Sequence, residues 1–232
     1  MNETKKTQVY NLVILDKSGS MSSIRKSAVD GYNETLGSIR AAQKKHLDTQ
    51  EHYVSLAAFC GCGITMLYDK TPINEANNMS MADYVPCCAT PLFDAIGSTV
   101  QKLKVAIKDV EDAAVLVTII TDGYENASKE WSRQAVKKLI EECKADGWMI
   151  SFIGAGEDVM QTAYTLSITN TVVWEKTEQG TMQMFDNENC ARERFFDRMA
   201  CCCDQSMAPD ERRQARQNLS QRFYQKDEDE EK

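Results

Sequence analysis

Three short segments, far apart in the chain, carry oxygen-bearing side chains of the kind that bind divalent cations. Asp16, Ser18 and Ser20 lie in the first segment, Thr90 in the second and Asp122 in the third. Two carboxylates and three hydroxyls suit a hard ion such as Mg2+, which prefers oxygen ligands and keeps some of its water. Neutral hydroxyls do not cancel the charge of the ion, so the ion can still accept an acidic oxygen from outside.

The first and third segments each follow a run of apolar residues that predicts a buried strand. Residues 9–15 precede Asp16, and residues 115–120 precede Thr121-Asp122-Gly123. Open α/β sheets bind ligands where their strands end. We therefore expect both carboxylates at one edge of a sheet, and Gly19 permits the tight turn that aims the serines at the same point.

The remaining hydrophobic pattern predicts alternating strands and helices. Four further strands are predicted, at 53–59, 64–68, 148–153 and 171–174. Apolar residues recur at helical spacing over 24–39, 92–107 and 131–143, and a short helix is expected near 157–165. The glycine-containing link at 60–63 predicts a hairpin and hence one antiparallel edge strand. The pattern indicates a three-layer α/β/α fold of the Rossmann-like type, with a mainly parallel six-stranded sheet.

The three polar segments resemble the metal-ion-dependent adhesion site (MIDAS) of von Willebrand factor A (vWA) domains. Asp16-Lys17-Ser18-Gly19-Ser20, Thr90 within Ala89–Ile96, and Thr121-Asp122-Gly123 follow one another in the family's order. The resemblance implies that Ser18, Ser20 and Thr90 bind the metal directly. It implies that Asp16 and Asp122 bind it directly or through water, with Mg2+, or Mn2+ or Ca2+, as the ion.

The same resemblance implies a function in protein recognition without catalysis. Members of the family bind protein partners, commonly through a partner carboxylate that completes the metal shell. Intracellular members often act beside ATPases or within other assemblies, so we expect a protein partner that presents an Asp or Glu. Lys17, Met21 and residues beside Thr90 are expected to border the contact surface. The chain departs from the family in having Cys87-Cys88-Ala89 before the threonine, where glycines are frequent.

The domain organisation is expected to have three parts. Residues 1–175 form the vWA-like domain, and residues 176–208 form a helical extension that packs on it. Residues 209–232 are polar and end in an acidic run, which is typical of a disordered, solvated tail. An alternative is a scaffold that binds its partners through residues 176–232 without any metal.

Charge and hydropathy exclude several classes of partner. The 232-residue chain has a formal net charge of -8 and a pI of about 5.0, which argues against nucleic acid and against an anionic membrane surface. No apolar run approaches the roughly 20 residues of a spanning helix, and the polar N-terminal segment lacks the apolar core of a secretory signal. We expect a soluble, cytoplasmic protein.

Signals for an enzyme are weak. The two histidines, His46 and His52, lie away from the predicted strand ends that carry the polar segments. A metal-assisted phosphoester hydrolase on the same scaffold remains the alternative, because Mg2+ with an aspartate can activate water. Residues 154–159 imitate a dinucleotide-binding turn, but Val159 replaces the last glycine and two acids would repel a pyrophosphate.

The chain has nine cysteines, and several are adjacent in sequence. An odd number with adjacent pairs disfavours a disulfide framework. A zinc site would need Cys-x-x-Cys pairs or histidine partners, whereas the chain offers Cys60-x-Cys62 and no Cys-x-x-Cys pair. We interpret the cysteines as reduced thiols that act as small hydrophobic residues.

Overall fold

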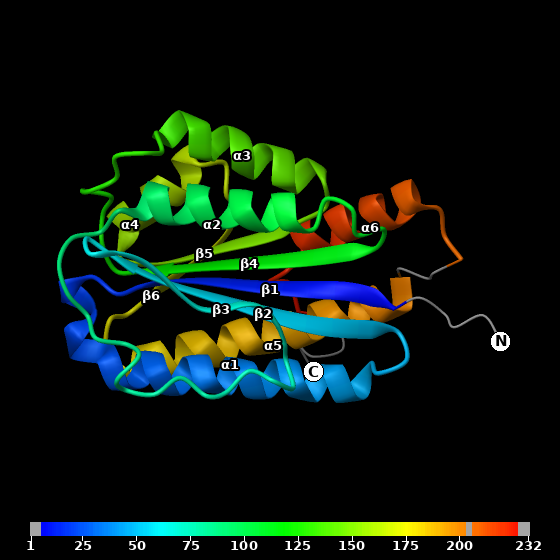
Figure 1. Ribbon diagram of the computed structural model, residues 1–232, viewed down its shortest axis with the longest axis horizontal. Coiled ribbons are helices and arrows are strands. Elements are labelled where there is room, and N and C mark those ends of the chain that lie inside the picture. Colours follow the sequence, from blue (N-terminus) through cyan, green and yellow to red (C-terminus); the bar gives the residue numbers. More distant parts are fainter. Residues whose placement is uncertain (1–5, 203–205, 227–232) are drawn as a thin grey trace.

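The computed structural model describes residues 6–202 and 206–226, and six strands in this part form one sheet between two layers of helices (Figure 1). The strands are β1 (Thr7–Asp16), β2 (Gln50–Cys60), β3 (Gly63–Pro72), β4 (Ala113–Thr121), β5 (Met149–Ala155) and β6 (Asn170–Trp174). The helices are η1 (Gly19–Ile24), α1 (Arg25–Lys45), α2 (Leu92–Ala106), α3 (Arg133–Ala145), α4 (Glu157–Thr165), α5 (Glu178–Cys202) and α6 (Pro209–Gln221).

The strand order is β3-β2-β1-β4-β5-β6. All neighbouring pairs are parallel except β2 and β3, which form the antiparallel hairpin. The register places Val13 of β1 between Leu56 of β2 and Thr118 of β4. The predicted fold class, a mainly parallel six-stranded α/β sheet with one antiparallel edge strand, is confirmed.

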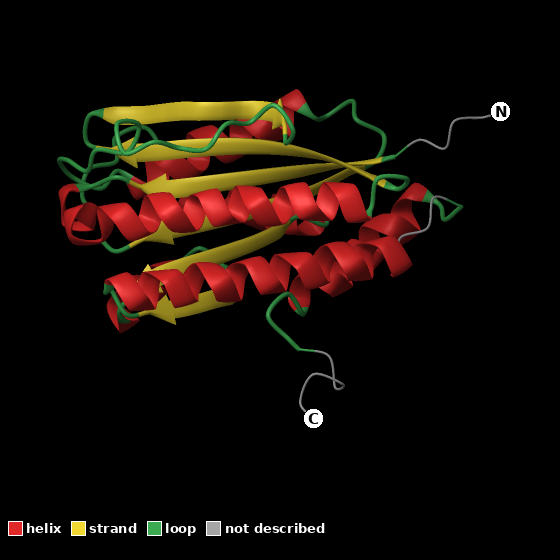
Figure 2. Ribbon diagram, turned by 90° about the horizontal axis from the view of Figure 1, so that it is seen from below, coloured by secondary structure: helices red, strands yellow, loops and turns green. Residues whose placement is uncertain are grey.

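The two faces of the sheet are covered by different helices. Helices α2, α3 and α4 lie on one face, whereas α1 and α5 run side by side beneath the other (Figures 1 and 2). Leu12 and Ile14 of β1 point to the first layer, while Val13 and Leu15 point to the second. A strand buried on both faces reads as a nearly continuous apolar run because its side chains alternate in direction.

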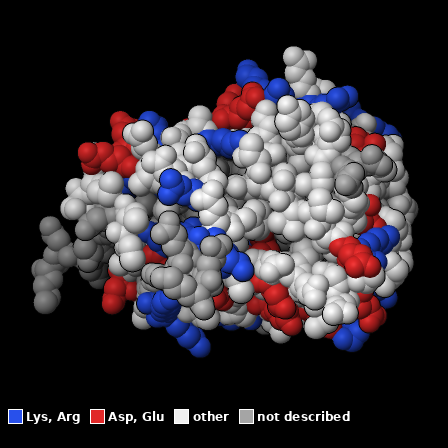
Figure 3. All heavy atoms as spheres, turned by 180° about the vertical axis from the view of Figure 1, so that it is seen from behind, with Lys and Arg blue, Asp and Glu red and all other residues white. Residues whose placement is uncertain are grey.

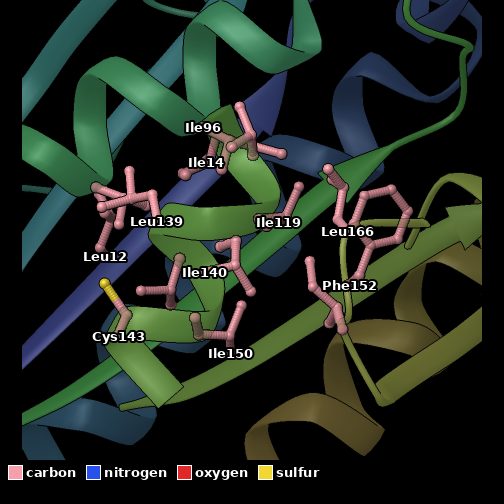
Figure 4. Packing of buried hydrophobic residues seen from close by; sticks show 14 of the residues in the cluster. Leu12, Ile14, Ile96, Ile119, Leu139, Ile140, Cys143, Ile150, Phe152 and Leu166 are labelled. Carbon is pink, nitrogen blue, oxygen red and sulfur yellow. The ribbon is translucent and has the colours of Figure 1, made fainter. Parts of the chain in front are cut away.

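The core beneath α2 and α3 is made of aliphatic side chains from the sheet and the helices. Leu139 and Ile140 of α3 pack over Ile119 and Ile150, and Phe152 closes one side beside Leu166 (Figure 4). Burial of each such side chain contributes about 1.5–3 kcal/mol. This packing fixes the sheet, and the polar segments lie at the carboxyl ends of its central strands β1 and β4.

Helices α1 and α5 pack closely because Gly31 has no side chain. A Cβ atom at Gly31 would lie 2.1 Å from a ring carbon of Phe185. The approach seats the ring of Phe185 in the core between α1, α5 and the sheet. Residues 176–208, expected as a helical extension, thus supply α5, one of the two helices on this face.

The expectation of a disordered segment from residue 209 onward is wrong for residues 209–221, which form α6. Arg216 pairs with the buried Asp112 that precedes β4, and Phe223 is fully buried against α5 and the sheet. The polar composition hid the helix because two of its arginines, Arg212 and Arg216, are buried rather than solvated. The terminal acidic run at 227–232 lies outside the described residues.

Charges of both signs are mixed on the surface. On the face opposite to that in Figure 1, Lys and Arg side chains and Asp and Glu side chains are interspersed around a broad area of uncharged residues (Figure 3). No helix within 6–202 and 206–226 is long and apolar enough to cross a membrane.

Candidate metal site

The candidate site lies where β1 and β4 end. These two strands are neighbours in the middle of the sheet. The chain runs from β1 through α1 to β2 on one side, and later through α2 to β4 on the other side of β1. This reversal of strand order opens a crevice at the carboxyl ends of the two strands, which is the usual ligand position in open α/β sheets.

Asp16 is the last residue of β1 and is fully buried. Its Oδ1 accepts a hydrogen bond of 2.6 Å from the backbone N–H of Ser18, and its Oδ2 accepts one of 2.6 Å from Thr121 Oγ1. Burial raises the pKa of the Asp16 carboxyl to about 6, against the lowering effect of these hydrogen bonds. Asp122 adds to the increase through charge repulsion, so a cation between the two carboxylates would relieve an electrostatic cost.

The hydroxyls of the first segment connect the two carboxylates. Ser18 Oγ lies 3.1 Å from Ser20 Oγ, and Ser20 Oγ donates a hydrogen bond of 2.8 Å to Asp122 Oδ1. The residues therefore converge although Ser20 and Asp122 are 102 positions apart. The 3-10 helix η1 begins at Gly19 and turns both serines back over the end of β1.

Thr90 reaches the same place from the segment before α2. A Cβ atom built on Gly123 would lie 3.1 Å from Thr90 Oγ1 and 3.9 Å from Asp16 Oδ2. Thr90 and Asp16 thus both lie next to the same side of Gly123. The structure brings together all five residues named from the sequence, Asp16, Ser18, Ser20, Thr90 and Asp122.

Three residues that the sequence analysis missed hold the Thr90 segment in place. Asn126 Oδ1 accepts a hydrogen bond from the Thr90 N–H, and the Asn126 N–H donates to the Thr90 carbonyl. Glu125 accepts from the Phe93 N–H, and Asp94 accepts from three consecutive N–H groups at 129–131. Only Asp94 carried a signal, as an acid in the first turn of a predicted helix.

A lysine also contacts the site. Lys176 Nζ lies 2.6 Å from Asp122 Oδ2, and the Asp122 side chain is fully buried. Lys176 was not expected here because it follows β6, two strands away from β4. The expectation that Met21 borders a contact surface is wrong, because Met21 is 1% exposed and packs in the core between α1 and the sheet.

Neither histidine is near the site. His46 Nε2 lies 2.8 Å from Asp197 of α5, and His52 is buried near the start of β2 with its ring against Phe196. Both lie toward the opposite end of the strands from Asp16. They therefore provide no base or acid for chemistry at the β1 and β4 ends.

The donor set fits a hard divalent cation. Two buried carboxylates repel one another, and three hydroxyls lie on the same crevice. The ammonium group at Asp122 shows that a positive charge is accommodated there. Oxygen donors of this number and kind match the preference of Mg2+ and similar ions.

No family model and no curated protein sequence matches the chain, whereas many solved structures do. The VWA domain of SpRpn10 aligns with a TM-score of 0.52 at 11% identity, over 78% of this chain and 95% of that domain. Manganese-loaded TRAP protein from Plasmodium vivax aligns at 0.50 and 17%, over 78% and 74%.

A third similar structure is proximal thread matrix protein 1 from the mussel byssus, with zinc in its MIDAS motif. It aligns with a TM-score of 0.55 at 15% identity, over 78% of this chain. The chain spans 47% of that protein and 62% of the PilB minor pilin from Streptococcus sanguinis. At these identities the similarity establishes that the chain has a vWA-like fold.

Proposed function

We propose that the protein is a metal-dependent recognition module that binds a carboxylate of a protein partner. The observation that carries the proposal is the convergence of Asp16, Ser18, Ser20, Thr90 and Asp122 at one point of the sheet edge. They come from three segments that are remote in sequence. Oxygen donors from three remote segments that converge on one point are typical of an ion site, whereas helix-capping residues act within their own segment.

In this proposal Ser18, Ser20 and Thr90 hold the ion through their hydroxyls, and Asp16 and Asp122 hold it directly or through water. The bound ion supplies a Lewis-acidic position that an Asp or Glu of the partner completes. The chain's own contribution is positioning: Thr121 and the Ser18 N–H orient Asp16, and Asn126 orients Thr90. No step of bond making or breaking is assigned to the site.

Calorimetric titration with Mg2+ and with Mn2+ tests the ion site. We expect one ion per chain for the wild type, and loss of the heat in Asp16→Ala and in Thr90→Ala. Asp109→Ala and Thr65→Ala are matched controls, because both residues are exposed and lie outside the crevice. Equal heats in wild type, Asp16→Ala and Thr90→Ala would remove the site.

Recognition of a carboxylate is tested on the Mn2+-loaded protein. The relaxation of water protons by bound Mn2+ reports whether the ion keeps an exchangeable water, and acetate or a short Glu-containing peptide should displace it. Partner binding that survives Asp16→Ala and chelation would instead indicate the segment 176–232. Turnover of phosphoesters that disappears in Asp16→Ala would indicate the hydrolase.

A further inference from the structure

Four cysteines from two remote segments form a cluster beside the Thr90 segment. Cys60 ends β2 and Cys62 lies in the β2–β3 turn, while Cys87 and Cys88 lie in the loop before Thr90. Cys60 Sγ is 3.4 Å from Cys87 Sγ, and Cys62 Sγ is 3.8 Å from Cys87 Sγ and 3.3 Å from Cys88 Sγ. Four other described cysteines lie elsewhere: Cys143 on α3, and Cys190, Cys201 and Cys202 on α5.

The spacing of three of the sulfur atoms is close to that in the coordination shell of a tetrahedral ion, and the Cys88 sulfur adjoins one of the three. With a Zn–S bond of about 2.3 Å, the edge of an S4 tetrahedron is about 3.8 Å. The three sulfur atoms of Cys60, Cys62 and Cys87 all lie within 4.8 Å of one another. Because Cys62 contacts both Cys87 and Cys88, the arrangement is a cluster rather than two isolated pairs.

The backbone is shaped to bring the two segments together. The Gly61 N–H donates a hydrogen bond of 2.7 Å to the Ala89 carbonyl. A Cβ atom at Gly61 would lie only 3.0 Å from the Ala89 nitrogen and 3.1 Å from Cys88 Cβ, so a larger residue here would crowd the approach of the two segments. Cys88 has a φ of 59°, a left-handed conformation that is uncommon for a residue other than glycine.

We propose that this cluster is a structural Zn2+ site, with Cys60, Cys62 and Cys87 as ligands and Cys88 as the fourth. Soft thiolates select zinc over the hard ions expected at the oxygen site. The exposed positions of Cys62 and Cys88 give the ion a path of entry. None of these four cysteines is among the five residues of the oxygen site, so the zinc site can be tested independently of the proposed function.

A zinc ion here would fasten the loops that build the oxygen site. The Cys87 N–H donates to the Lys17 carbonyl at 2.9 Å, and the Gly19 N–H donates to the Cys88 carbonyl at 3.0 Å. Cys88 is also two residues from Thr90. Binding of the metal would therefore hold the β2–β3 turn, the first polar segment and the Thr90 segment in one arrangement.

The test uses the full chain, purified under reducing conditions and titrated with Co2+ and then Zn2+. We expect one thiolate-bound Co2+ per chain, seen by its charge-transfer absorption and displaced by Zn2+, and one zinc per chain by elemental analysis. Cys62→Ser and Cys87→Ser should each weaken zinc binding by more than the roughly 10- to 100-fold that changes outside the ligand shell cost. Cys88→Ser should lower the intensity of the thiolate-to-Co2+ charge-transfer absorption, because one fewer thiolate then binds the ion.

Two controls separate this site from other sources of binding. Cys190→Ser, an exposed cysteine on α5, should bind zinc as the wild type does. Asp16→Ala should also keep the thiolate-bound ion, which distinguishes it from an ion held by oxygen ligands. Cys62 is exposed, so Cys62→Ser gives an answer even if Cys87→Ser fails to fold.

Several results would overturn the proposal. One is a fully reduced wild-type chain that shows no thiolate absorption with Co2+. A second is zinc binding unchanged in both Cys62→Ser and Cys87→Ser. A third is a Cys60–Cys87 disulfide, found by mass spectrometry in protein that was isolated from reducing cells with thiols blocked at lysis.

Discussion

The ammonium nitrogen of Lys176 lies 2.6 Å from Oδ2 of Asp122, a carboxylate whose side chain is fully buried. The same carboxylate accepts the hydrogen bond from Ser20 through its other oxygen. Lys176 therefore places a positive charge beside the position at which a metal ion would bind. The lysine and the ion would compete for one oxygen atom, so the lysine sets how strongly the crevice attracts a cation.

We predict that Lys176→Gln binds Mn2+ more tightly than the wild type. The Lys176 side chain is 30% exposed, whereas the Asp122 side chain is buried. We therefore expect a gain near the upper end of the roughly 0.2–1 kcal/mol that exposed ion pairs contribute, which is about fivefold. Without metal, the same variant should be less stable, because Asp122 then lacks its neighbouring positive charge. Calorimetry with Mn2+ and thermal unfolding in chelator measure the two effects.

Lys17→Gln is the control for net charge, because Lys17 lies in the first polar segment and has no ion pair with Asp122 among those found in the described residues. An equal increase in affinity in both variants would show that only the net charge matters. Unchanged Mn2+ affinity in Lys176→Gln would show that the ion pair between Lys176 and Asp122 does not form in solution.

A buried ion pair within α5 is hydrogen-bonded to Thr118 of β4 and so links the helix to the sheet. Glu188 and Arg192 have side chains exposed by only 2% and 1%, with Arg192 Nη2 3.2 Å from Glu188 Oε1. Thr118 donates to Glu188 Oε1 and Tyr224 donates to Oε2. Glu188→Ala would leave the guanidinium buried without its partner, so the free energy of unfolding should fall by about 3–5 kcal/mol.

Urea unfolding checks this value, with Glu193→Ala as the control because Glu193 is an exposed residue of α5 whose contact with Ser38 is open to solvent. A loss below 1 kcal/mol in Glu188→Ala, as for a surface pair, would show that the network is open to water.

Strand positions and the places of the candidate metal-binding residues were predictable because they depend on local patterns. The buried strands read as apolar runs, and Asp16 and Asp122 follow two of them directly. The supports of the site were not predictable in this way. Asn126 contacts Thr90 from 36 positions away, and Lys176 reaches Asp122 only because the sheet brings β6 near β4.

The cysteine cluster escaped the sequence analysis for a similar reason. Neither Cys60-x-Cys62 nor Cys87-Cys88 has the spacing of a zinc motif. The cysteines that contact one another across these two segments are 25 to 27 residues apart along the chain. Only the folded hairpin turn places one half beside the other. Patterns within a short window cannot report a ligand set that is divided in this way.

Phe223 shows that the C-terminal segment belongs to the folded unit. It is fully buried and its ring lies 6.0 Å from that of Phe195 on α5. Phe223→Ala should lower the free energy of unfolding by about 3–5 kcal/mol, as for other large-to-small changes in a core. Asn218→Ala, at an exposed position of α6, should change it by less than about 0.5 kcal/mol.

Urea unfolding of Phe223→Ala and Asn218→Ala, beside the wild type, measures the two changes in the free energy of unfolding. If both variants have the stability of the wild type, the segment after residue 206 contributes nothing to the fold.

His52 should make the protein less stable in mild acid. Burial, with a smaller effect from His46, lowers the pKa of His52 in the folded protein to about 3, whereas an exposed histidine titrates near 6.5. Between these values the unfolded chain binds a proton that the folded protein does not. Acidification therefore favours unfolding, and the contribution of His52 should cost about 2 kcal/mol between pH 7 and pH 5.

The comparison of wild type with His52→Gln isolates this effect. Asp16 acts in the opposite sense, because its raised pKa of about 6 makes the folded protein take up a proton before the unfolded chain as the pH falls. The pH dependence of the free energy of unfolding of the wild type therefore contains both effects. Urea unfolding at pH 7 and pH 5 should show a fall in stability that is smaller in His52→Gln by about 2 kcal/mol. Equal falls in the two proteins would mean that the His52 ring, whose Nε2 lies 3.0 Å from Gln50 Oε1, can be protonated in the folded state. Its position under Phe196 would then be open to water, contrary to the packing that joins α5 to β2.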